Sequence, residues 1–282
     1  MYDLPNGMLS LPANRLYKVL DGPTLFHFEG EREAPVFVSA LLHGNEPAGW
    51  EALRRLLLRY EGMDLPRSLS FFVGNVEAAR YGKRFLDHQP DYNRVWRGDG
   101  LPEHDMMRQI QADMKERNVF LSIDVHNTTG KNPHYACVNR TEPVFLNIAR
   151  IFSNRVVYFL RPEGVQTVAF ARICPAVTIE CGQPGQESGI EHAVEFIDRC
   201  LTLNEVPDHI YHPEPIDLFH TVAVVKIPEQ IRFGFDGSGE DIQFKRSFES
   251  YNFCDLPAGM VIGRISEGLE HPLDIRDDMG NE

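Results

Sequence analysis

Residues 35–46 read PVFVSALLHGNE and join an apolar run to a short polar turn. The run at 35–42 is rich in β-branched and aromatic residues, which predicts a buried strand. A helix is predicted at 47–60, because Trp50, Leu53 and Leu57 recur at helical spacing on one face. Ligands bind at the carboxyl ends of strands in α/β sheets, so the turn between these two elements is a candidate site.

The rest of the first two hundred residues alternates between the same two kinds of element. Apolar runs predict further strands, at 68–74, 119–125, 155–160 and 175–181. Periodic apolar positions predict further helices, at 102–117, 142–153 and 187–203. Such alternation is typical of α/β proteins, in which helices flank both faces of a mixed or largely parallel sheet.

The character of the sequence changes after about residue 203. Prolines separate short apolar segments, such as 221–227 (TVAVVKI) and 260–265 (MVIGRI), and no long helical period follows. The sequence therefore predicts an α/β fold in two parts. The first is a mixed sheet flanked by helices, at 1–204, and the second is a smaller β-rich C-terminal domain, at 205–282.

Composition argues against several classes of protein. The 282 residues carry 41 acidic and 28 basic side chains, and this net charge of -13 argues against general binding of nucleic acid or of an anionic membrane. The five cysteines form no CxxC pair, which predicts reduced thiols in a cytoplasmic protein. The first ten residues lack the features of a secretory signal, and no apolar run approaches the roughly 18 residues that span a bilayer.

His43 and Glu46 come directly after the first predicted strand. A histidine nitrogen and a carboxylate oxygen are both zinc ligands, and Gly44 permits the tight turn that brings the two side chains to one point. The alternative is a polar turn in which Glu46 lies near a helix start and is favoured by the helix dipole. This pair alone leaves both interpretations open.

A second histidine, in the segment DVHNTT at 124–129, favours the metal interpretation. His126 also follows an apolar strand, and alternation puts Asp124 on the same side, where a carboxylate orients a metal-bound histidine. A hydrogen-bonded histidine at a strand end is the simpler alternative, but two of them, one with a glutamate three residues on, argue against coincidence. Two histidines and one glutamate leave a fourth position for water, as in catalytic zinc sites, so we expect one zinc per chain.

Glu180 lies near the end of the apolar run PAVTIEC at 175–181. A carboxylate is costly there unless it has a function or a partner. Beside zinc it can accept a proton from water, which predicts a general base; an ion-paired glutamate at the edge of the core is the alternative. Catalysis by the neighbouring Cys181 would need a histidine partner that cannot be inferred, and we interpret this cysteine as a small core residue.

Cations occur in two places that could meet the substrate. Asn93 and Arg94 are adjacent in a loop and can grip a carboxylate, the arginine in a bidentate manner. Arg172, eight residues before Glu180, is a further candidate. Most loop arginines are merely solvated, and a surface charge fits the sequence around Arg172 equally well.

Together these motifs resemble the succinylglutamate desuccinylase/aspartoacylase family, a branch of the zinc carboxypeptidase-like hydrolases. The resemblance covers about 35–182 and rests on HGNE at 43–46, GKRF at 82–85, NR at 93–94, DVHNTT at 124–129 and IECG at 179–182. It implies three zinc ligands, His43, Glu46 and His126. It also implies that Glu180 is the base that activates water.

The resemblance further implies how the substrate is held. Arg84 would polarise the scissile carbonyl, and Asn93 with Arg94 would clamp the substrate carboxylate. Arg84 and Asn93 are nine positions apart, where the family usually has seven. Tyr251 is the nearest candidate for the family's C-terminal substrate-binding tyrosine. The β-rich C-terminal domain of the family narrows access to the zinc.

The sequence thus predicts a zinc-dependent amidohydrolase that acts on a small N-acyl amino acid or a similar carboxylate-bearing amide. A metallocarboxypeptidase that acts on short peptides would use the same zinc site and is the alternative. A protein that binds zinc and a small anion without turnover is a third interpretation, but binding alone needs no base such as Glu180. The expected partner is a small anionic substrate, neither nucleic acid nor a membrane, and a homo-oligomer stays open.

Overall fold

A mixed sheet of eight strands forms the centre of the protein, in a computed structural model that describes residues 4–209, 215–235, 237, 239–277 and 280–281. Its order is β1-β3-β2-β4-β7-β5-β6-β8. The strands are β1 (Thr24–Phe28), β2 (Val36–Ala40), β3 (Leu69–Val73), β4 (Leu121–His126), β5 (Tyr135–Val138), β6 (Arg155–Tyr158), β7 (Ala176–Glu180) and β8 (Asp217–His220). Strands β3, β2, β4 and β7 are parallel, whereas β1 and β5 run antiparallel to β3 and β7.

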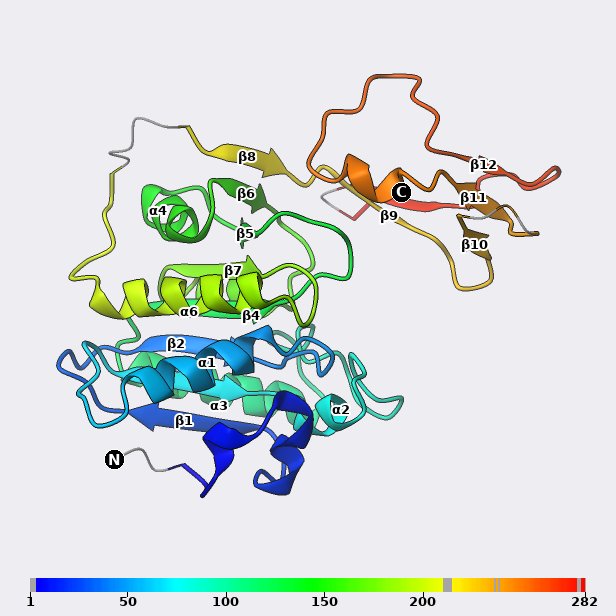
Figure 1. Cartoon of the computed structure of the whole chain (residues 1–282). Helices are drawn as coiled ribbons and strands as arrows, with labels where there is room; N and C mark the ends of the chain where they lie inside the picture. Colours follow the sequence, from blue (N-terminus) through cyan, green and yellow to red (C-terminus); the bar gives the residue numbers. More distant parts are fainter. Residues whose placement is uncertain (1–3, 210–214, 236, 238, 278–279, 282) are drawn as a thin grey trace.

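Helices flank this sheet on both sides (Figure 1). Those on one side pack against one another, and they are α1 (Ala48–Arg59), α4 (Pro143–Phe152) and α6 (Glu187–Thr202). Helix α3 (Pro102–Glu116) lies behind the sheet in Figure 1, and the short α5 (Gln166–Phe170) contacts β4 and β7. The remaining short helices are α2 (Val76–Arg80), η1 (Met8–Ser10), η2 (Ala13–Lys18) and η3 (Phe248–Tyr251). None of the helices in the described part is long and apolar enough to cross a membrane.

Burial follows this layering. Every residue of β2, β3 and β4 is buried, because these central strands are covered on both faces. Large aromatic side chains fill the core beside them, and the ring of Phe37 on β2 stacks on that of Phe170 on α5 at 4.6 Å. The carboxyl ends of β2 and β4 are therefore fixed next to each other in a tightly packed region.

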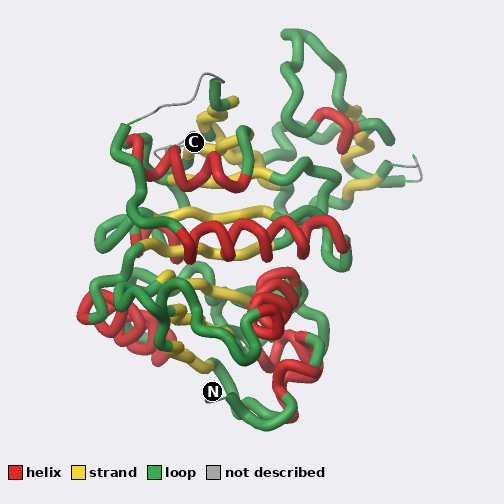
Figure 2. The backbone as a smooth tube through the Cα atoms, turned by 60° about the vertical axis from the view of Figure 1, so that its left-hand side comes forward, coloured by secondary structure: helices red, strands yellow, loops and turns green. Residues whose placement is uncertain are grey.

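The segment after residue 203 is β-rich, as the sequence predicts. It contains a three-stranded sheet of β10 (Phe233–Gly234), β11 (Ile242–Phe244) and β12 (Gly263–Ile265), and a two-stranded sheet of β9 (Ala223–Lys226) and β13 (Asp274–Asp277). Strand β8 also belongs to this segment, yet it pairs with β6 at the edge of the large sheet. Figure 2 shows that long loops connect the small strands. Residues 210–214 of the predicted domain lie outside the described part.

The mixed sheet with flanking helices and extra C-terminal sheets confirms the predicted fold class. Three strands of the large sheet were not predicted, β1, β5 and the four-residue β8. β1 carries the polar His27 in a run of five residues, and β5 is only four residues long and half-buried. Runs this short carry too little periodicity to be recognised.

Candidate active site

The turn after β2 carries His43 and Glu46. Leu41, fully buried, has a left-handed φ of 54°, which is costly for a leucine and redirects the chain at the strand end. A Cβ on Gly44 would lie 2.2 Å from the backbone nitrogen of Ala79, so the close approach of α2 requires a glycine here. The N–H of Gly44 donates to the carbonyl oxygen of Arg84 at 3.0 Å, which ties this turn to the loop that carries Arg84.

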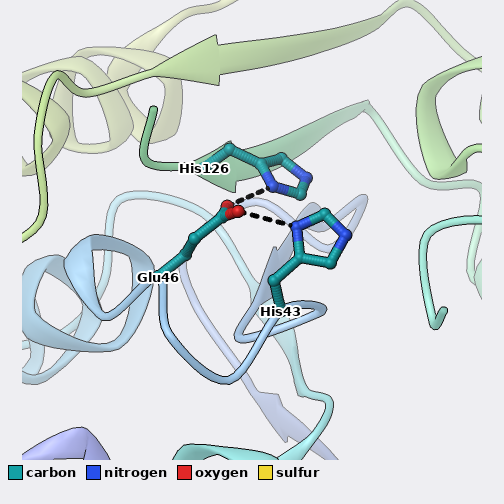
Figure 3. Close-up of side chains that lie close together, drawn as sticks. All are labelled: His43, Glu46 and His126. Atoms are coloured by element: carbon teal, nitrogen blue, oxygen red, sulfur yellow. Dashed lines mark hydrogen bonds and ion pairs between the residues drawn. The ribbon is translucent and has the colours of Figure 1, made fainter. Parts of the chain in front are cut away.

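Glu46 lies between two imidazoles (Figure 3). Its Oε1 atom is 2.9 Å from Nδ1 of His43, and its Oε2 atom is 2.7 Å from Nδ1 of His126. All three residues are buried, and the ligand atoms that they offer lie within 4.8 Å of one another. The ends of the neighbouring strands β2 and β4 thus bring together the three residues that the sequence proposed as metal ligands.

Two further carboxylates face the outer nitrogens of these imidazoles. Nε2 of His43 lies 3.0 Å from Oδ1 of Asp91, and Nε2 of His126 lies 2.8 Å from Oδ2 of Asp124. Each Nε2–H can donate to its carboxylate, which leaves both Nδ1 atoms on the side of Glu46; a metal that displaced the protons there would meet the tautomer of a metal-bound histidine. Two imidazole nitrogens and one carboxylate, supported in this way, fit zinc.

The charges in this cluster depend on one another. Burial favours the neutral form of Glu46, but His126 and His43 outweigh burial and hold the pKa of Glu46 well below its usual range. Burial alone would lower the pKa of His126, yet Asp124 and Glu46 raise it well above its usual value. Glu46 is therefore anionic, the state in which a carboxylate binds a cation.

Glu180 ends β7 directly beside His126. The two residues are partners in the register of β4 and β7, so their side chains leave the same face of the sheet. Burial raises the pKa of Glu180 to about 7, and its buried Oε2 atom has no hydrogen-bond partner among the described residues. No described cation lies within ion-pair distance of Glu180. The alternative interpretation, an ion-paired glutamate at the edge of the core, therefore finds no partner among the described residues. A carboxyl group in this state can accept and return a proton near neutral pH.

These groups line one cavity of about 570 Å³. Its walls include seven of the residues proposed from the sequence, His43, Glu46, Arg84, Asn93, Arg94, His126 and Glu180. A larger cavity of about 1000 Å³ lies elsewhere, between 4–10 and 54–64, and contains none of them. The smaller cavity is the candidate active site, because the buried titratable groups gather there.

Arg84 is held beside the proposed ligands. Its Nε and Nη2 atoms donate to Oδ2 of Asp91 at 3.1 and 3.0 Å, and its Nη1 atom lies 3.5 Å from Oε1 of Glu46. The segment between Arg84 and Asn93 is longer than is usual in the family, and its extra residues lie outside the cavity. There Gln89 accepts hydrogen bonds from the side chain of Asn75 at 2.9 Å and from the backbone N–H of Leu86 at 3.1 Å. The extra residues therefore leave Arg84 at the site.

The side chains of Asn93 and Arg94 differ in whether protein partners already occupy their polar groups. The amide of Asn93 donates to Oδ2 of Asp124 at 3.1 Å, and its oxygen accepts the backbone N–H of Gln166 at 2.9 Å. Arg94 donates to the carbonyl oxygen of Asn93 at 2.7 Å, and burial lowers the pKa of its guanidinium. No described carboxylate lies within ion-pair distance of Arg94, so this guanidinium is available to a substrate.

Two substrate contacts proposed from the sequence lie away from the cavity. Arg172 is exposed and lines a separate hollow of about 350 Å³ together with Arg97 and Arg161. The hydroxyl of Tyr251 lies 3.1 Å from Oγ of Ser247, and Tyr251 does not line the cavity. These two assignments are therefore withdrawn. Their neighbours in sequence gave no periodic signal that could place them.

Other residues at the site, in or behind the wall of the cavity, could not be identified from the sequence. Asp91 holds both His43 and Arg84, and its position two residues before Asn93 was the one available signal. Tyr135 and Phe253 also line the cavity, and both come from segments without a readable period. Cys181, in contrast, is fully buried and does not line the cavity, so no catalytic role is assigned to it.

Comparison with known proteins gives a consistent picture. Residues 33–202 match the model of the succinylglutamate desuccinylase/aspartoacylase catalytic domain. Succinylglutamate desuccinylases from Vibrio parahaemolyticus (TM-score 0.61, 17% identity, 86% of this chain and 76% of that chain) and Chromobacterium violaceum (0.56, 17%, 78% and 82%) share the fold. So does a candidate metallopeptidase from Shewanella denitrificans (0.50, 15%, 64% and 79%). No curated protein matches the chain in sequence.

Proposed function

Because this chain belongs to the succinylglutamate desuccinylase/aspartoacylase family, we propose that it is a zinc-dependent deacylase that cleaves the amide bond of a small, carboxylate-bearing N-acyl amino acid. One observation carries the proposal: Glu180, a half-buried residue whose buried Oε2 atom has no hydrogen-bond partner among the described residues, stands beside a cluster of His43, Glu46 and His126 that fits a metal. A site that only bound an ion would need no such carboxyl group.

Zinc would be held by Nδ1 of His43, Nδ1 of His126 and the carboxylate of Glu46. When bound there, it supplies Lewis acidity that polarises the scissile carbonyl and lowers the pKa of water. Asp91 and Asp124 hold the two imidazoles in the required tautomer, and they act through the histidines.

The other residues position the substrate and move one proton. Glu180 accepts a proton from the attacking water and returns it to the nitrogen of the leaving amine. Arg84, next to Glu46, stabilises negative charge on the scissile carbonyl oxygen. Arg94 pairs with the substrate carboxylate. Asn93 keeps Asp124 in place, so we assign it mainly a positioning role.

The metallocarboxypeptidase alternative differs in substrate size. Thr221 and Phe253, both from beyond residue 205, line the cavity, and its volume of about 570 Å³ suits a small molecule. We therefore propose that the C-terminal segment limits access to the site. This favours N-acyl amino acids over long peptides.

The test is a hydrolysis panel with the full-length, zinc-loaded protein. It contains N-acetyl and N-succinyl amino acids, dipeptides and a ten-residue peptide, each before and after removal of metal by a chelator. We expect metal-dependent release of the free amino acid from at least one N-acyl compound. Faster trimming of the long peptide would favour the carboxypeptidase alternative, and zinc binding without any hydrolysis would favour the binding protein.

A further inference from the structure

Strands β5 and β6 bury only one of their faces under a helix. Ala136 and Val156 are fully buried on the side where α4 packs. Cys137 and Val157, the alternate residues, are only half-buried. Side chains alternate along a strand, so these two face the other way, and both line the candidate active-site cavity.

The half-buried residues lie in register with the catalytic candidates. Glu180 pairs with Tyr135 across β7 and β5. Two residues away on each strand, Thr178 of β7 pairs with Cys137 of β5. On the other side of β5, Cys137 pairs with Val157 of β6. All five residues line the candidate active-site cavity. A strip of side chains therefore leads from Glu180 across the open face of β5 and β6.

The part of this strip farthest from Glu180, which begins at Cys137 and Val157, is apolar. Phe159, just after β6, and Val165 line the same cavity as Cys137 and Val157. Burial raises the pKa of the Cys137 thiol well above its usual range, so the thiol stays neutral and behaves as a small apolar group. We use the name apolar strip for Cys137, Val157, Phe159 and Val165.

Phe253 reaches the cavity from the C-terminal segment. Its ring lies 4.8 Å from the ring of Tyr135 and 5.1 Å from that of Phe219. Its φ of 59° is in the left-handed region, which is costly for a bulky side chain. Such a conformation persists only where the surroundings demand it, and here it places an aromatic ring on Tyr135, next to Glu180.

The charges of the cavity leave room for one substrate carboxylate. Three arginines line it, and two of them already have carboxylate partners: Arg84 pairs with Asp91 at 3.0 Å and Arg161 with Glu163 at 3.4 Å. Only Arg94 has no such partner among the described residues. A second substrate carboxylate on the apolar strip would lose its water without gaining a partner.

We propose that the apolar strip is a subsite for an apolar group of the substrate, aliphatic or aromatic, and that Phe253 is a specificity-determining wall of this subsite. The substrate is then an N-acyl amino acid with one carboxylate and one sizeable apolar substituent. This inference rests on the proposed function, because it names the substrate class of the same site.

The first test compares kcat/KM of the zinc-loaded protein for five substrates: N-acetylglycine, N-hexanoylglycine, N-acetylphenylalanine, N-acetylaspartate and N-succinylglutamate. Each buried methylene can add up to about fourfold. We expect N-hexanoylglycine or N-acetylphenylalanine to exceed N-acetylglycine, N-acetylaspartate (two carboxylates) and N-succinylglutamate (three carboxylates) by at least about tenfold. A preference for N-acetylaspartate or N-succinylglutamate, the two substrates with more than one carboxylate, would overturn the inference.

The second test changes residues of the subsite and uses the apolar substrate that wild type prefers in the first test. Phe253→Ala removes the wall, and Val157→Thr puts a hydroxyl on the strip with little change in volume. We expect the ratio of kcat/KM for the preferred apolar substrate to that for N-acetylglycine to fall at least about fivefold in Phe253→Ala and severalfold in Val157→Thr. Val225→Thr, on the exposed strand β9, is the control and should keep the wild-type ratio. A structural role alone would slow all substrates equally, so unchanged ratios in both subsite variants would also overturn the inference.

A third test needs no turnover. Calorimetry compares the binding of acetate, hexanoate, 3-phenylpropanoate and succinate to the zinc-loaded protein. We expect hexanoate or 3-phenylpropanoate to bind at least about tenfold more tightly than acetate and succinate. If this holds while no N-acyl amino acid is cleaved, the subsite stands and the proposed function fails. If acetylated or succinylated amino acids are cleaved without any apolar preference in cleavage or binding, the function stands and the subsite is rejected.

Discussion

Glu180 and His126 are direct partners across β7 and β4, and they differ in how their polar atoms are satisfied. Both ring nitrogens of His126 face carboxylates, at 2.7 Å from Glu46 and 2.8 Å from Asp124. The buried Oε2 atom of Glu180 has no partner in the described part of the chain. His126 is thus held in one orientation, whereas Glu180 is free to exchange a proton.

Asp91 supports the metal site from behind His43. Its Oδ1 atom accepts the Nε2–H of His43 at 3.0 Å. Asp91→Asn removes the negative charge there, so the affinity for zinc should fall by about 10–100-fold, the usual effect of losing such a partner. Competition with a chromogenic chelator measures this affinity. Asp113→Asn is the matched control, because Asp113 also faces a histidine, His27, but far from the cavity. Equal zinc affinity in wild type and Asp91→Asn would show that the carboxylate does not support the site.

Arg94 should decide whether the enzyme requires a substrate carboxylate. Arg94 is exposed in the free protein, so its loss should cost less than the about 2–5 kcal/mol of a fully buried charge pair, but Arg94→Ala should still lower kcat/KM on the acid at least about fivefold. The methyl ester of the same substrate should be cleaved poorly by wild type and be nearly indifferent to the change. Arg172→Ala, an exposed arginine outside the cavity, should leave both rates unchanged. Preference of wild type for the ester would contradict the role of Arg94.

Gly44 joins the metal site to the packing of α2. Its added Cβ would lie 2.2 Å from the nitrogen of Ala79, so Gly44→Ala must displace backbone. Overpacking of this kind typically costs about 1–3 kcal/mol, and the shift of His43 and Glu46 should also weaken zinc binding. Urea unfolding of the metal-free protein and zinc titration measure the two effects. Gly22→Ala, where nothing lies within 4 Å, should change neither; equal results for the two variants would contradict the steric account.

A histidine pair outside the active site should make stability depend on pH. Nδ1 of His134 lies 2.8 Å from Nδ1 of His192, so one ring donates and the other must be neutral to accept. Burial lowers the pKa of both, and His134 further lowers that of His192. Their folded-state pKa values lie below 6.5, the ordinary value of a histidine side chain, so the unfolded chain takes up protons first as the pH falls. The neutral pair therefore makes its full contribution to the free energy of unfolding above about pH 6.5, and this contribution is lost as the pH falls below that value.

Urea unfolding at pH 7.5 and 5.5 checks this expectation. Glu180 and His126 have raised pKa values and act in the opposite direction, so the pair shows in the difference between variants: from pH 7.5 to 5.5 the free energy of unfolding of the metal-free wild type should fall more, or rise less, than that of His192→Gln. His88→Gln is the control, because His88 is largely exposed and should leave the wild-type difference in place. An equal change in wild type and His192→Gln would assign the pH dependence to other groups.

The sequence predicted the central strands and the groups at their ends for a physical reason. Strands buried on both faces, such as β2, β4 and β7, appear as continuous apolar runs, and a polar residue that ends such a run stands out. His126 and Glu180 were found in this way. The structure changed one explanation: Gly44 is required by the closeness of α2, since its φ is not in the left-handed region.

The remaining part of the site depends on contacts between distant segments. Tyr135 and Cys137 lie on β5, whose four residues are too few to show a period. Phe253 lies in an irregular segment and reaches the cavity only because the C-terminal chain folds back onto β5. Arg172 is close to Glu180 in sequence but faces another hollow. Nearness along the chain does not locate such residues, because loops set their direction.

The proposal that Glu180 is the general base is the centre of this account. Glu180→Gln keeps nearly the same volume, so a packing explanation for lost activity is weak. Glu191→Gln, an exposed glutamate on α6, is the control and should be fully active. General acid–base groups contribute about 10²–10⁴-fold, and their loss is felt mainly in kcat.

The most direct measurement is therefore kcat of zinc-loaded Glu180→Gln, with zinc content determined on the same sample. We predict one zinc per chain, a thermal melting temperature close to that of wild type, and a kcat lowered at least about a hundredfold. A variant that keeps its zinc and wild-type kcat would contradict the role of Glu180, and one that loses its zinc would make Glu180 a ligand.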